Sequence, residues 1–346
     1  MKIIFLFLLL SFYKVFSSNL RGKETEILEF SDDDHDWTHF FDFQEKFNKR
    51  YETLDEVEMR FQIFSYNLHN IITHNLDNKR NFTMGINQFS DLTSNEFEGL
   101  YLGGLNIESG SYGCKLFSSD ASDAPVSIDW RNKNAVTSVK DQGQCGSCWA
   151  FSSTGAVEGA WAISKNQLLD LSEEQLVECA TGLSYGSRGC NGGQMEGAFK
   201  YVIEHGQCSL SSYPYNSGNG NSSSCKETSC SPIVRISSCS DVVPCDQTSL
   251  KAAVARQPVS VAISADTRLF QSYSSGIITS PYCYTSLDHG VLIVGYGSEN
   301  GIDYWLVKNS WGESWGENGY VKIARSDDKN DPGICGIAMN PSFPTV

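Results

Sequence analysis

The stretch Gln142-Gly143-Gln144-Cys145-Gly146-Ser147-Cys148-Trp149 decides how the rest of the 346-residue chain is interpreted. It is a glycine-rich turn that leads into residues 150–158, a run typical of a buried helix. A cysteine at the first turn of a helix faces unpaired N–H groups and the positive end of the helix dipole, and both favour thiolate over thiol. We therefore predict that Cys148 is a nucleophile.

A thiolate nucleophile needs a base or cation beside it and a third group that fixes the orientation of that base. His289, in the sequence Leu287-Asp288-His289-Gly290, is the best candidate for the base, because four of the other histidines belong to the first third of the chain and His205 lies in a helix-to-turn stretch. Asn309 offers a neutral amide oxygen and has a large aromatic residue, Trp311, two positions later. These residues predict a Cys-His-Asn constellation.

Other chemistries fit parts of this pattern. Cys145 and Cys148 form a Cys-x-x-Cys pair, which is a redox motif in some proteins, but no thioredoxin-like βαβ pattern surrounds it. A lone histidine before glycine is often structural. Zinc sites need paired, closely spaced ligands, and the Cys145/Cys148 pair has no second pair at finger spacing. We therefore expect no metal and no cofactor.

Composition limits the function classes. The chain has 26 Lys plus Arg and 41 Asp plus Glu, a net charge of −15, which argues against nucleic acid as the main partner because phosphate binding needs a basic surface. With 40% hydrophobic and 12% aromatic residues the chain is not disordered, and its length allows one large domain or two modest ones. Twelve cysteines indicate an oxidising compartment and a first interpretation of six disulfides.

The N-terminus is typical of a secretory signal. Met1-Lys2 precedes the apolar run from Ile3 to Leu10, and small residues follow near Ser17. This run is far shorter than the roughly 20 residues that span a bilayer, so we predict a signal peptide over residues 1–17 and no membrane insertion. Two sequons, beginning at Asn81 and Asn221, suit a secreted chain and predict glycosylation there.

Composition also shifts near residue 123. The segment from Gly103 to Asp123 is rich in glycine, serine and small polar residues, as a linker would be, and we place a boundary just before Ala124. Upstream, one stripe at spacings of three and four residues predicts a helix that crosses another and meets it through polar pairs. The stripe consists of Glu56, Arg60, Phe64, Asn67, Ile71 and Asn75. Residues at every second position from Gly85 to Asp91 predict a short strand.

Downstream of residue 123 the pattern is mixed. We predict helices over 148–164 and 193–205, and a third that starts at Ser172 with Gln175 completing a capping box. Strands are predicted over 259–265, 291–296, 304–307 and 320–324.

With its Cys-Gly-Ser-Cys-Trp signature and the downstream His289 and Asn309, the chain resembles papain-like cysteine proteases of the cathepsin L-like branch over nearly its whole length. The resemblance implies an α+β, papain-like two-domain fold, with a helical left domain that carries Cys148 and a β-barrel-like right domain that carries His289 and Asn309. Residues 18–123 would be a helical inhibitory propeptide that crosses the cleft in the unproductive direction and is released in acid. Residues 124–346 would be the mature peptidase domain.

The resemblance also implies roles. Cys148 and His289 would act as a thiolate–imidazolium pair, Asn309 would orient the imidazole, Trp311 would shield that hydrogen bond, and Gln142 would stabilise the oxyanion. The substrate-binding residues would be Gly146, Gly192, Gly193, Met195, Ala262, Leu287, Asp288, Gly290, Trp311 and Asn340. A neutral Asn340 at the bottom of the pocket predicts a hydrophobic residue second before the cut. No His-His pair of an occluding loop is present, which predicts an endopeptidase.

By the same resemblance the disulfides are Cys145–Cys190, Cys179–Cys225 and Cys283–Cys335, while Cys148 stays free. Cys114 would lie in the discarded part, and the remaining cysteines could form two further bridges of open connectivity: Cys208, Cys230, Cys239 and Cys245. The expected partners are polypeptide substrates, the chain's own propeptide and cystatin-type inhibitors, and the enzyme would be a monomer. The resemblance implies a zymogen of the secretory pathway that reaches the lysosome, another acidic vacuole or the extracellular space. A catalytically silent binding protein and a free inhibitor remain as alternatives.

Overall fold

We analysed a computed structural model that describes residues 34–103, 105, 112–279 and 283–346. The predicted signal peptide, residues 1–17, lies outside the described residues. In the part that is described, no helix has both the length and the apolar character needed to cross a bilayer.

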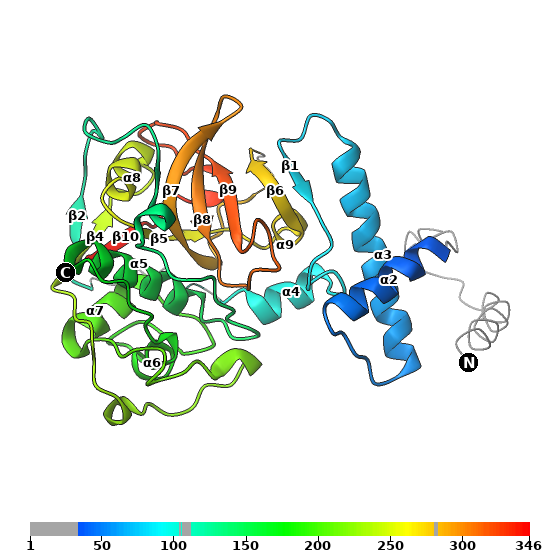
Figure 1. Ribbon diagram of the computed structural model, residues 1–346, viewed down its shortest axis with the longest axis horizontal. Coiled ribbons are helices and arrows are strands. Elements are labelled where there is room, and N and C mark those ends of the chain that lie inside the picture. Colours follow the sequence, from blue (N-terminus) through cyan, green and yellow to red (C-terminus); the bar gives the residue numbers. More distant parts are fainter. Residues whose placement is uncertain (1–33, 104, 106–111, 280–282) are drawn as a thin grey trace.

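Helices and strands alternate along the C-terminal two thirds of the chain, whereas helices dominate the N-terminal third (Figure 1). The helices are α2 (Asp34–Lys46), α3 (Leu54–Leu76), α4 (Ser94–Tyr101), α5 (Cys148–Lys165), α6 (Glu173–Cys179), α7 (Met195–His205), α8 (Gln247–Val254) and α9 (Arg268–Gln271), with 3-10 turns η1 (Trp130–Lys133), η2 (Ser217–Asn219), η3 (Glu227–Ser229) and η4 (Ile334–Gly336). The strands are β1 (Phe82–Met84), β2 (Lys115–Phe117), β3 (Ile128–Asp129), β4 (Ser238–Val242), β5 (Val259–Ile263), β6 (Tyr273–Ile278), β7 (His289–Glu299), β8 (Ile302–Lys308), β9 (Tyr320–Ala324) and β10 (Ser342–Thr345).

The described strands form one ten-stranded sheet in the order β1-β6-β9-β8-β7-β5-β10-β4-β2, with β3 beside β7. Its centre is β7, which is buried from His289 to Gly297 and pairs antiparallel with both β5 and β8. The two outermost strands, β1 and β2, both precede residue 124, and Figure 1 shows them at opposite ends of the sheet. Residues upstream of the predicted boundary therefore complete both edges of the sheet.

Two apolar cores give the C-terminal part its two halves. One gathers around α5, α6 and α7, and the other lies within the sheet around β5, β7, β8 and β9. Helix α5 runs between them and is buried along nearly its whole length, which small residues make possible. At Gly155, a Cβ atom would lie 2.7 Å from Cδ2 of Leu292 on β7, so glycine lets the helix approach the sheet closely.

Most predicted elements are confirmed, with differences at their ends. Helix α6 begins after Ser172, whose hydroxyl accepts a hydrogen bond from the Gln175 N–H at 3.0 Å. The reciprocal half of the predicted capping box is wrong, because the Gln175 amide instead binds Tyr201, the Gly206 carbonyl and the Cys208 N–H. The Gln175 side chain therefore bonds residues distant in sequence and not the N-cap residue of its own helix.

Two predictions upstream of residue 124 are wrong. The short strand is β1, at Phe82–Met84, and the chain from residue 85 to 91 forms a turn in which the Asn87 side chain accepts from the Phe89 N–H. An asparagine that bonds its own backbone two residues later favours a turn over a strand. The segment from Gly103 to Asp123 is also more than a linker, because it contains β2 and a disulfide-bonded Cys114.

The predicted polar helix is α3, which packs its aromatic side chains on α2. Phe64 contacts Phe40 and Phe43, with ring centroids 5.3 Å and 5.0 Å away. Polar pairs between helices are present, but they differ from the expected ones. Ser65, outside the stripe, donates to Asp36 of α2, and the stripe residue Arg60 pairs with Glu96 of α4. Asn67 donates to the carbonyls of Ser90 and Leu92. The polar stripe therefore holds the turn and strand that follow α3.

We predict that Gly197→Ala destabilises the folded chain by about 3 kcal/mol, because overpacking is costly and the new Cβ atom would lie 1.8 Å from the Tyr185 carbonyl oxygen. Gly99→Ala is the matched control. Gly99 is also helical, yet nothing lies within 4 Å of its Cβ position, so this variant should be neutral or slightly more stable. Chemical denaturation of both variants in a Cys148→Ser background checks this, and equal midpoints would contradict it.

Candidate active site

Cys148 lies at the first position of α5 and is fully buried with a free thiol. The turn before it is fixed by the Cys145–Cys190 disulfide and by a hydrogen bond from the Gly146 N–H to the Cys190 carbonyl at 2.9 Å. Burial raises the pKa of the Cys148 thiol to about 11, and hydrogen bonds from the backbone N–H groups of Gly290, Gly103 and Trp149 offset this only in part. The thiol is therefore neutral at pH 7 in this form of the chain.

His289 is the first residue of β7 and is brought to Cys148 by the glycine that follows it. A Cβ atom on Gly290 would lie 3.2 Å from backbone atoms of Cys148 and Trp149, so any larger residue would need the start of β7 and the start of α5 to move apart by a few tenths of an ångström. Burial lowers the pKa of His289 to about 4, while its hydrogen bond with Asn309 acts in the opposite direction. The imidazole is neutral as well.

The hydrogen bonds of Asn309 set the tautomer of His289. The Asn309 Oδ1 atom accepts from the Ser310 N–H at 2.8 Å, which identifies it as the oxygen, and it lies 2.7 Å from His289 Nε2. Nε2 must then carry the proton, which leaves Nδ1 as the unprotonated nitrogen. Nδ1 has no hydrogen-bond partner among the described residues. The Trp311 ring stacks on the imidazole at 4.6 Å between centroids and shields this pair from water.

Gln142 is tied to the same loop through a residue that the sequence did not suggest. The Ser310 hydroxyl donates to Gln142 Oε1 at 2.6 Å, and this aims the Gln142 Nε2 group toward the Cys145 carbonyl at 2.9 Å. Ser310 thus connects the asparagine that holds the histidine to the glutamine beside the thiol. Its position between Asn309 and Trp311 was the only signal in the sequence.

The C-terminal end of α4 and the residues that follow it occupy the site. The Tyr101 carbonyl accepts from Gln142 Nε2 at 3.1 Å. Gly103 packs so tightly on Gly146 that a Cβ atom would lie 2.6 Å from the Gly146 carbonyl oxygen. Beside this contact a cavity of about 360 Å³ remains, lined by Leu102, Gly103, Gly146, Asn191 and Gly220 among others. The N-terminal part of the chain therefore covers both Cys148 and Gln142.

Aromatic side chains fasten this cover to Trp311. Phe89 and Phe97 meet the Trp311 ring edge-on, with centroids 5.6 Å and 5.1 Å away. Gln88 Nε2 donates to the Trp311 carbonyl at 2.7 Å. The residue that shields the His289–Asn309 pair is thus also a docking point for the N-terminal part.

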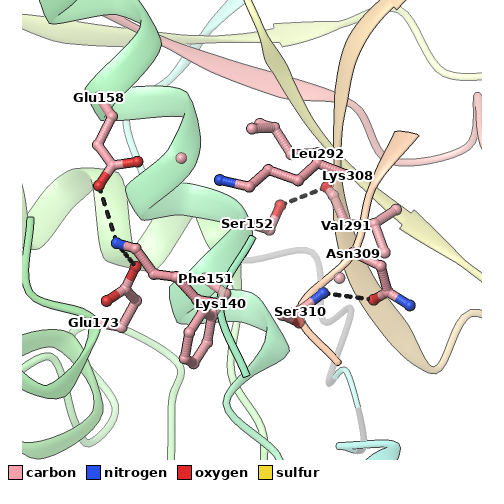
Figure 2. A pocket seen from close by; sticks show the side chains of 12 residues that line it. Lys140, Phe151, Ser152, Glu158, Glu173, Val291, Leu292, Lys308, Asn309 and Ser310 are labelled. Atoms are coloured by element: carbon pink, nitrogen blue, oxygen red, sulfur yellow. Dashed lines mark hydrogen bonds and ion pairs between the residues drawn. The ribbon is translucent and has the colours of Figure 1, made fainter. Parts of the chain in front are cut away.

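A cluster of buried charges lies where α5, α6 and β8 meet. Figure 2 shows Lys140 between Glu158 and Glu173, with Lys308 extending from β8 beside Asn309. The Lys140 ammonium lies 3.1 Å from Glu158 Oε1 and 2.6 Å from Glu173 Oε1. Burial raises the pKa of Glu173 above its ordinary value despite the charge of Lys140. These ion pairs join α5 to α6. Lys308 of β8 is linked to them through Thr137, which accepts from Lys308 at 3.0 Å and donates to Glu158 at 2.7 Å.

The predicted pocket residues are partly brought together. Met195, Ala262 and Leu287 belong to one apolar cluster. The Asn340 amide donates to Glu196 at 3.2 Å, and Glu196, which the sequence analysis did not single out, is buried with a raised pKa. Asp288 accepts from the Ala265 N–H, and burial raises its pKa to about 7. Gly193 lies against the Trp149 ring, and Gly146 forms a β-bridge with Asn191 beside Gly192.

The three disulfides that the resemblance implied are present: Cys145–Cys190, Cys179–Cys225 and Cys283–Cys335. The expectation that two bridges join Cys208, Cys230, Cys239 and Cys245 is wrong. Cys208 pairs with Cys230, but Cys239 pairs with Cys114, and Cys245 is free. In the described part of the chain, no three His, Cys, Asp or Glu side chains are grouped as metal ligands would be.

Comparison with known proteins agrees with this geometry. A sequence model of the papain family cysteine proteases matches residues 124–345, and one of the cathepsin propeptide inhibitor domain (I29) matches residues 40–97. The chain belongs to the papain family of cysteine proteases. It is a cysteine endopeptidase, a hydrolase, and its N-terminal part is an inhibitor domain, here called the prosegment.

Similar proteins include plant enzymes of this papain family. The chain is 46% identical over 301 residues to the probable cysteine protease RDL2 of Arabidopsis thaliana, covering 86% of this chain and 82% of the relative. It is 45% identical to the KDEL-tailed cysteine endopeptidase CEP2 of the same species, covering 84% and 81%. It also matches the probable cysteine protease RD21C at 47%, covering 65% of that protein.

Solved structures of proenzymes share the papain-like α+β fold. A recombinant stem bromelain precursor aligns with a TM-score of 0.82 and 40% identity, covering 90% of this chain and 99% of that one. The digestive procathepsin L 3 of Tenebrio molitor larval midgut aligns with a TM-score of 0.80 and 38% identity, covering 90% and 99%. The predicted fold class, with an N-terminal helical prosegment, is confirmed.

We predict that Cys148 of the intact zymogen reacts with iodoacetamide at pH 7 at least 100-fold more slowly than Cys148 of the processed enzyme. The reason is that burial under the prosegment raises its pKa to about 11 and only the thiolate reacts. Mass spectrometry of alkylated peptides over time gives both rates.

The free and half-buried Cys245 is an internal control for this measurement. Its rate should be similar in the two forms, because its surroundings lie outside the cover over Cys148. Equal Cys148 rates before and after processing would show that the prosegment does not hold the thiol neutral.

Proposed function

We propose that Cys148 is the nucleophile that attacks the substrate carbonyl, with His289 as its proton partner. Removing the prosegment lets water and substrate reach the pair, and the proton of the thiol moves to Nδ1 of His289. The thiolate then forms the C–S bond, His289 returns the proton to the leaving amine as the C–N bond breaks, and water drawn by His289 hydrolyses the thioester. The single observation that carries this proposal is the Asn309-oriented ring, with its free Nδ1, at the N-terminus of α5.

Gln142 and the backbone N–H of Cys148 are the proposed oxyanion donors. In the zymogen, Gln142 Nε2 already holds one carbonyl oxygen, that of Tyr101, and a substrate oxyanion would replace it. The Ser310 hydroxyl and the Cys145 carbonyl also bond the Gln142 amide and fix its orientation. Gln142 Nε2 therefore needs little reorganisation when negative charge develops on the substrate oxygen.

We assign the hydrophobic cluster of Met195, Ala262 and Leu287 to the side chain second before the cut, with Gly192, Gly193 and Gly290 giving the substrate backbone room. The three apolar side chains support a preference for Leu, Val or Phe, while the Asn340 amide is engaged with the buried Glu196. Peptide-library profiling tests this assignment, and a preference for Arg at that position would overturn it.

The catalytic roles predict a graded series of losses. Cys148→Ser should abolish peptide hydrolysis, because a serine hydroxyl lacks the acidity of the thiol. Gln142→Ala should lower kcat about 100-fold through loss of one oxyanion donor, and Asn309→Ala should lower it through a misoriented imidazole. Each zymogen is processed with added wild-type enzyme and assayed on a fluorogenic Phe-Arg or Leu-Arg peptide.

Gln167→Ala serves as the matched control, because Gln167 is exposed in the turn after α5. It should keep wild-type kcat. Full turnover by Cys148→Ser would contradict the assignment of Cys148 as nucleophile, and absence of turnover by the processed wild-type chain would support the catalytically silent alternative.

We propose that acid releases the prosegment by weakening ion pairs within it. Glu96 closes the capping box of α4 with Thr93 and lies 2.9 Å from the Arg60 guanidinium of α3. Partial burial opposes ionisation, but the Thr93 hydrogen bonds and the Arg60 charge hold the pKa of Glu96 below its ordinary value. A lowered carboxyl pKa stabilises the fold above the unfolded pKa, and this stability is lost as pH falls through the folded pKa. Lys49 and Tyr51, paired with Asp91, face the same junction.

Asp288 acts in the opposite direction. Its pKa is raised to about 7, mainly by burial and then by the charges of Asp266 and of Glu98 in the prosegment. Acid therefore neutralises Asp288 and removes its repulsion of Glu98. This favours docking of the prosegment as pH falls through 7. Release is therefore expected only at the lower pH where Glu96 is protonated, below about pH 4.5.

We predict that Glu96→Gln moves the midpoint of acid activation to higher pH. Glutamine can keep the capping box of α4 but not the ion pair with Arg60, so the variant lacks the charge-dependent stability at every pH. Activity released after incubation across pH 3.5–7 gives the midpoint. Glu45→Gln, at an exposed position on α2, should leave the midpoint unchanged, and equal midpoints for all three chains would exclude the Glu96 pair as the trigger.

The cellular assignments follow from the same proposal. We assign residues 1–17 to a signal peptide, a prosegment beginning at residue 18 and a peptidase domain over 124–346, in a secretory chain that acts in a lysosome, an acidic vacuole or outside the cell. Both sequon asparagines, Asn81 and Asn221, are exposed and suit glycosylation. The processed enzyme is proposed to be a monomer inhibited by cystatin-type proteins, and peptide sequencing with size-exclusion chromatography tests these points.

A further inference from the structure

A disulfide crosses the predicted processing boundary. Cys114 bonds to Cys239 in the peptidase domain, with Cα atoms 4.6 Å apart and 125 positions between them in sequence. The next residues form β2, which pairs in parallel with β4, so that Lys115 lies opposite Ser240 and Phe117 opposite Val242. Neither family match covers residues 98–123. This attachment is thus a feature of the chain that the family assignment leaves unexplained.

Packing adds to the covalent link. The Phe117 ring meets the Phe343 ring edge-on at 5.3 Å, and the Arg256 guanidinium lies 4.8 Å from the Phe117 centroid. The Phe117 carbonyl accepts from the Val243 N–H at 3.0 Å. Ser249 then both donates to the Ser119 carbonyl and accepts from the Ser119 N–H. The segment from Cys114 to Ser119 is therefore bound to β4, β10 and α8 as a strand of the peptidase sheet.

This segment is separate from the inhibitory contacts. The groups that cover Cys148 and Gln142 are Gly103 and the Tyr101 carbonyl, both upstream of Cys114. Among the described residues, the hydrogen bonds of residues 114–123 lead to β4, Val243 and α8, reach Ala124, or stay within the segment. A cut upstream of Cys114 would uncover the catalytic pair and leave β2 in place.

We propose that residues Cys114–Asp123 stay with the active enzyme as a permanent strand of the peptidase domain. The activating step is hydrolysis of a peptide bond upstream of Cys114, and the Cys114–Cys239 bond is unchanged by it. A cut at the 123/124 boundary alone would keep the inhibitor tethered by the disulfide at an effective concentration of about millimolar, so the enzyme would stay inhibited. This inference rests on the proposed function only in that a prosegment is removed.

The experiment uses wild-type zymogen processed in acid without reductant. Active molecules are captured with a biotinylated epoxide that alkylates Cys148, digested, and examined by mass spectrometry before and after reduction. The expected result is one reducible species that joins the Cys114 peptide to the Cys239 peptide, with an N-terminus upstream of Cys114. Captured enzyme that begins at or beyond Ala124, with no peptide attached to Cys239, would overturn the proposal.

The two proposals fail in different ways. If the epoxide does not label Cys148, the proposed mechanism is wrong, and the cross-link is still read from a digest of the whole acid-treated sample. If Cys148 is labelled and the Cys114 peptide is missing, the enzyme assignment holds and the retained strand is wrong.

A variant with Cys114→Ser and Cys239→Ser supplies a second test. Without the bond, β2 should separate from β4 more often, so the N-terminus of processed enzyme should be trimmed to residues beyond 114 and its Tm should fall by roughly 5–10 °C. The matched control replaces Cys208 and Cys230, a disulfide within the peptidase domain, and should keep the 114–123 segment. An untrimmed N-terminus and unchanged Tm in the first variant would contradict a holding role for the tether.

Discussion

The close approach of Gly290 to the backbone of Cys148 is the constraint on which the site depends. It brings the start of β7 against the N-terminus of α5, so the two halves of the domain meet where their reactive side chains begin. The small residues of α5 extend the same contact along the sheet, as Gly155 does against Leu292. Behind the contact, the buried ion pairs of Lys140 with Glu158 and Glu173 join α5 to α6. Breaking one partner of such a pair would leave a buried charge unpaired, so the cluster resists separation of the elements.

The sheet explains why one part of the N-terminal region can be released while another part stays attached. Its strands β1 and β2 occupy opposite edges, and each satisfies backbone groups that an open edge would expose. At the β1 edge the attachment is noncovalent: Phe82 pairs with Gly276, and Asn87 donates to the Gln271 carbonyl. At the β2 edge a disulfide fixes the strand. Acid can weaken the first attachment without affecting the second, so the inhibitory and structural parts of the N-terminal region can part during activation.

The sequence predicted the catalytic residues better than the contacts between residues that are far apart in the chain. Cys148, His289 and Asn309 could be found because each lies in a local motif whose chemistry is visible in the residue types. Ser310 was missed, since its link to Gln142 joins two loops that are far apart in the chain. The Cys114–Cys239 bond was missed for the same reason, because composition alone made residues 103–123 a linker and strand pairing depends on distant partners. The strand expected at Gly85–Asp91 failed because a period of two also occurs where Asn87 closes a turn on its own backbone.

The neutral catalytic pair links inhibition to pH in a second way. Under the prosegment, burial lowers the pKa of His289 to about 4 and raises that of Cys148 to about 11. Docking therefore favours the neutral imidazole, and by linkage protonation of His289 must weaken docking by the same factor. A histidine pKa that is lower in the docked state than in the open one stabilises docking above the open-state pKa, and this stability is lost as pH falls toward 4. The open enzyme needs the ion pair for reaction, so the charge state that catalyses is also the one that the prosegment binds least well.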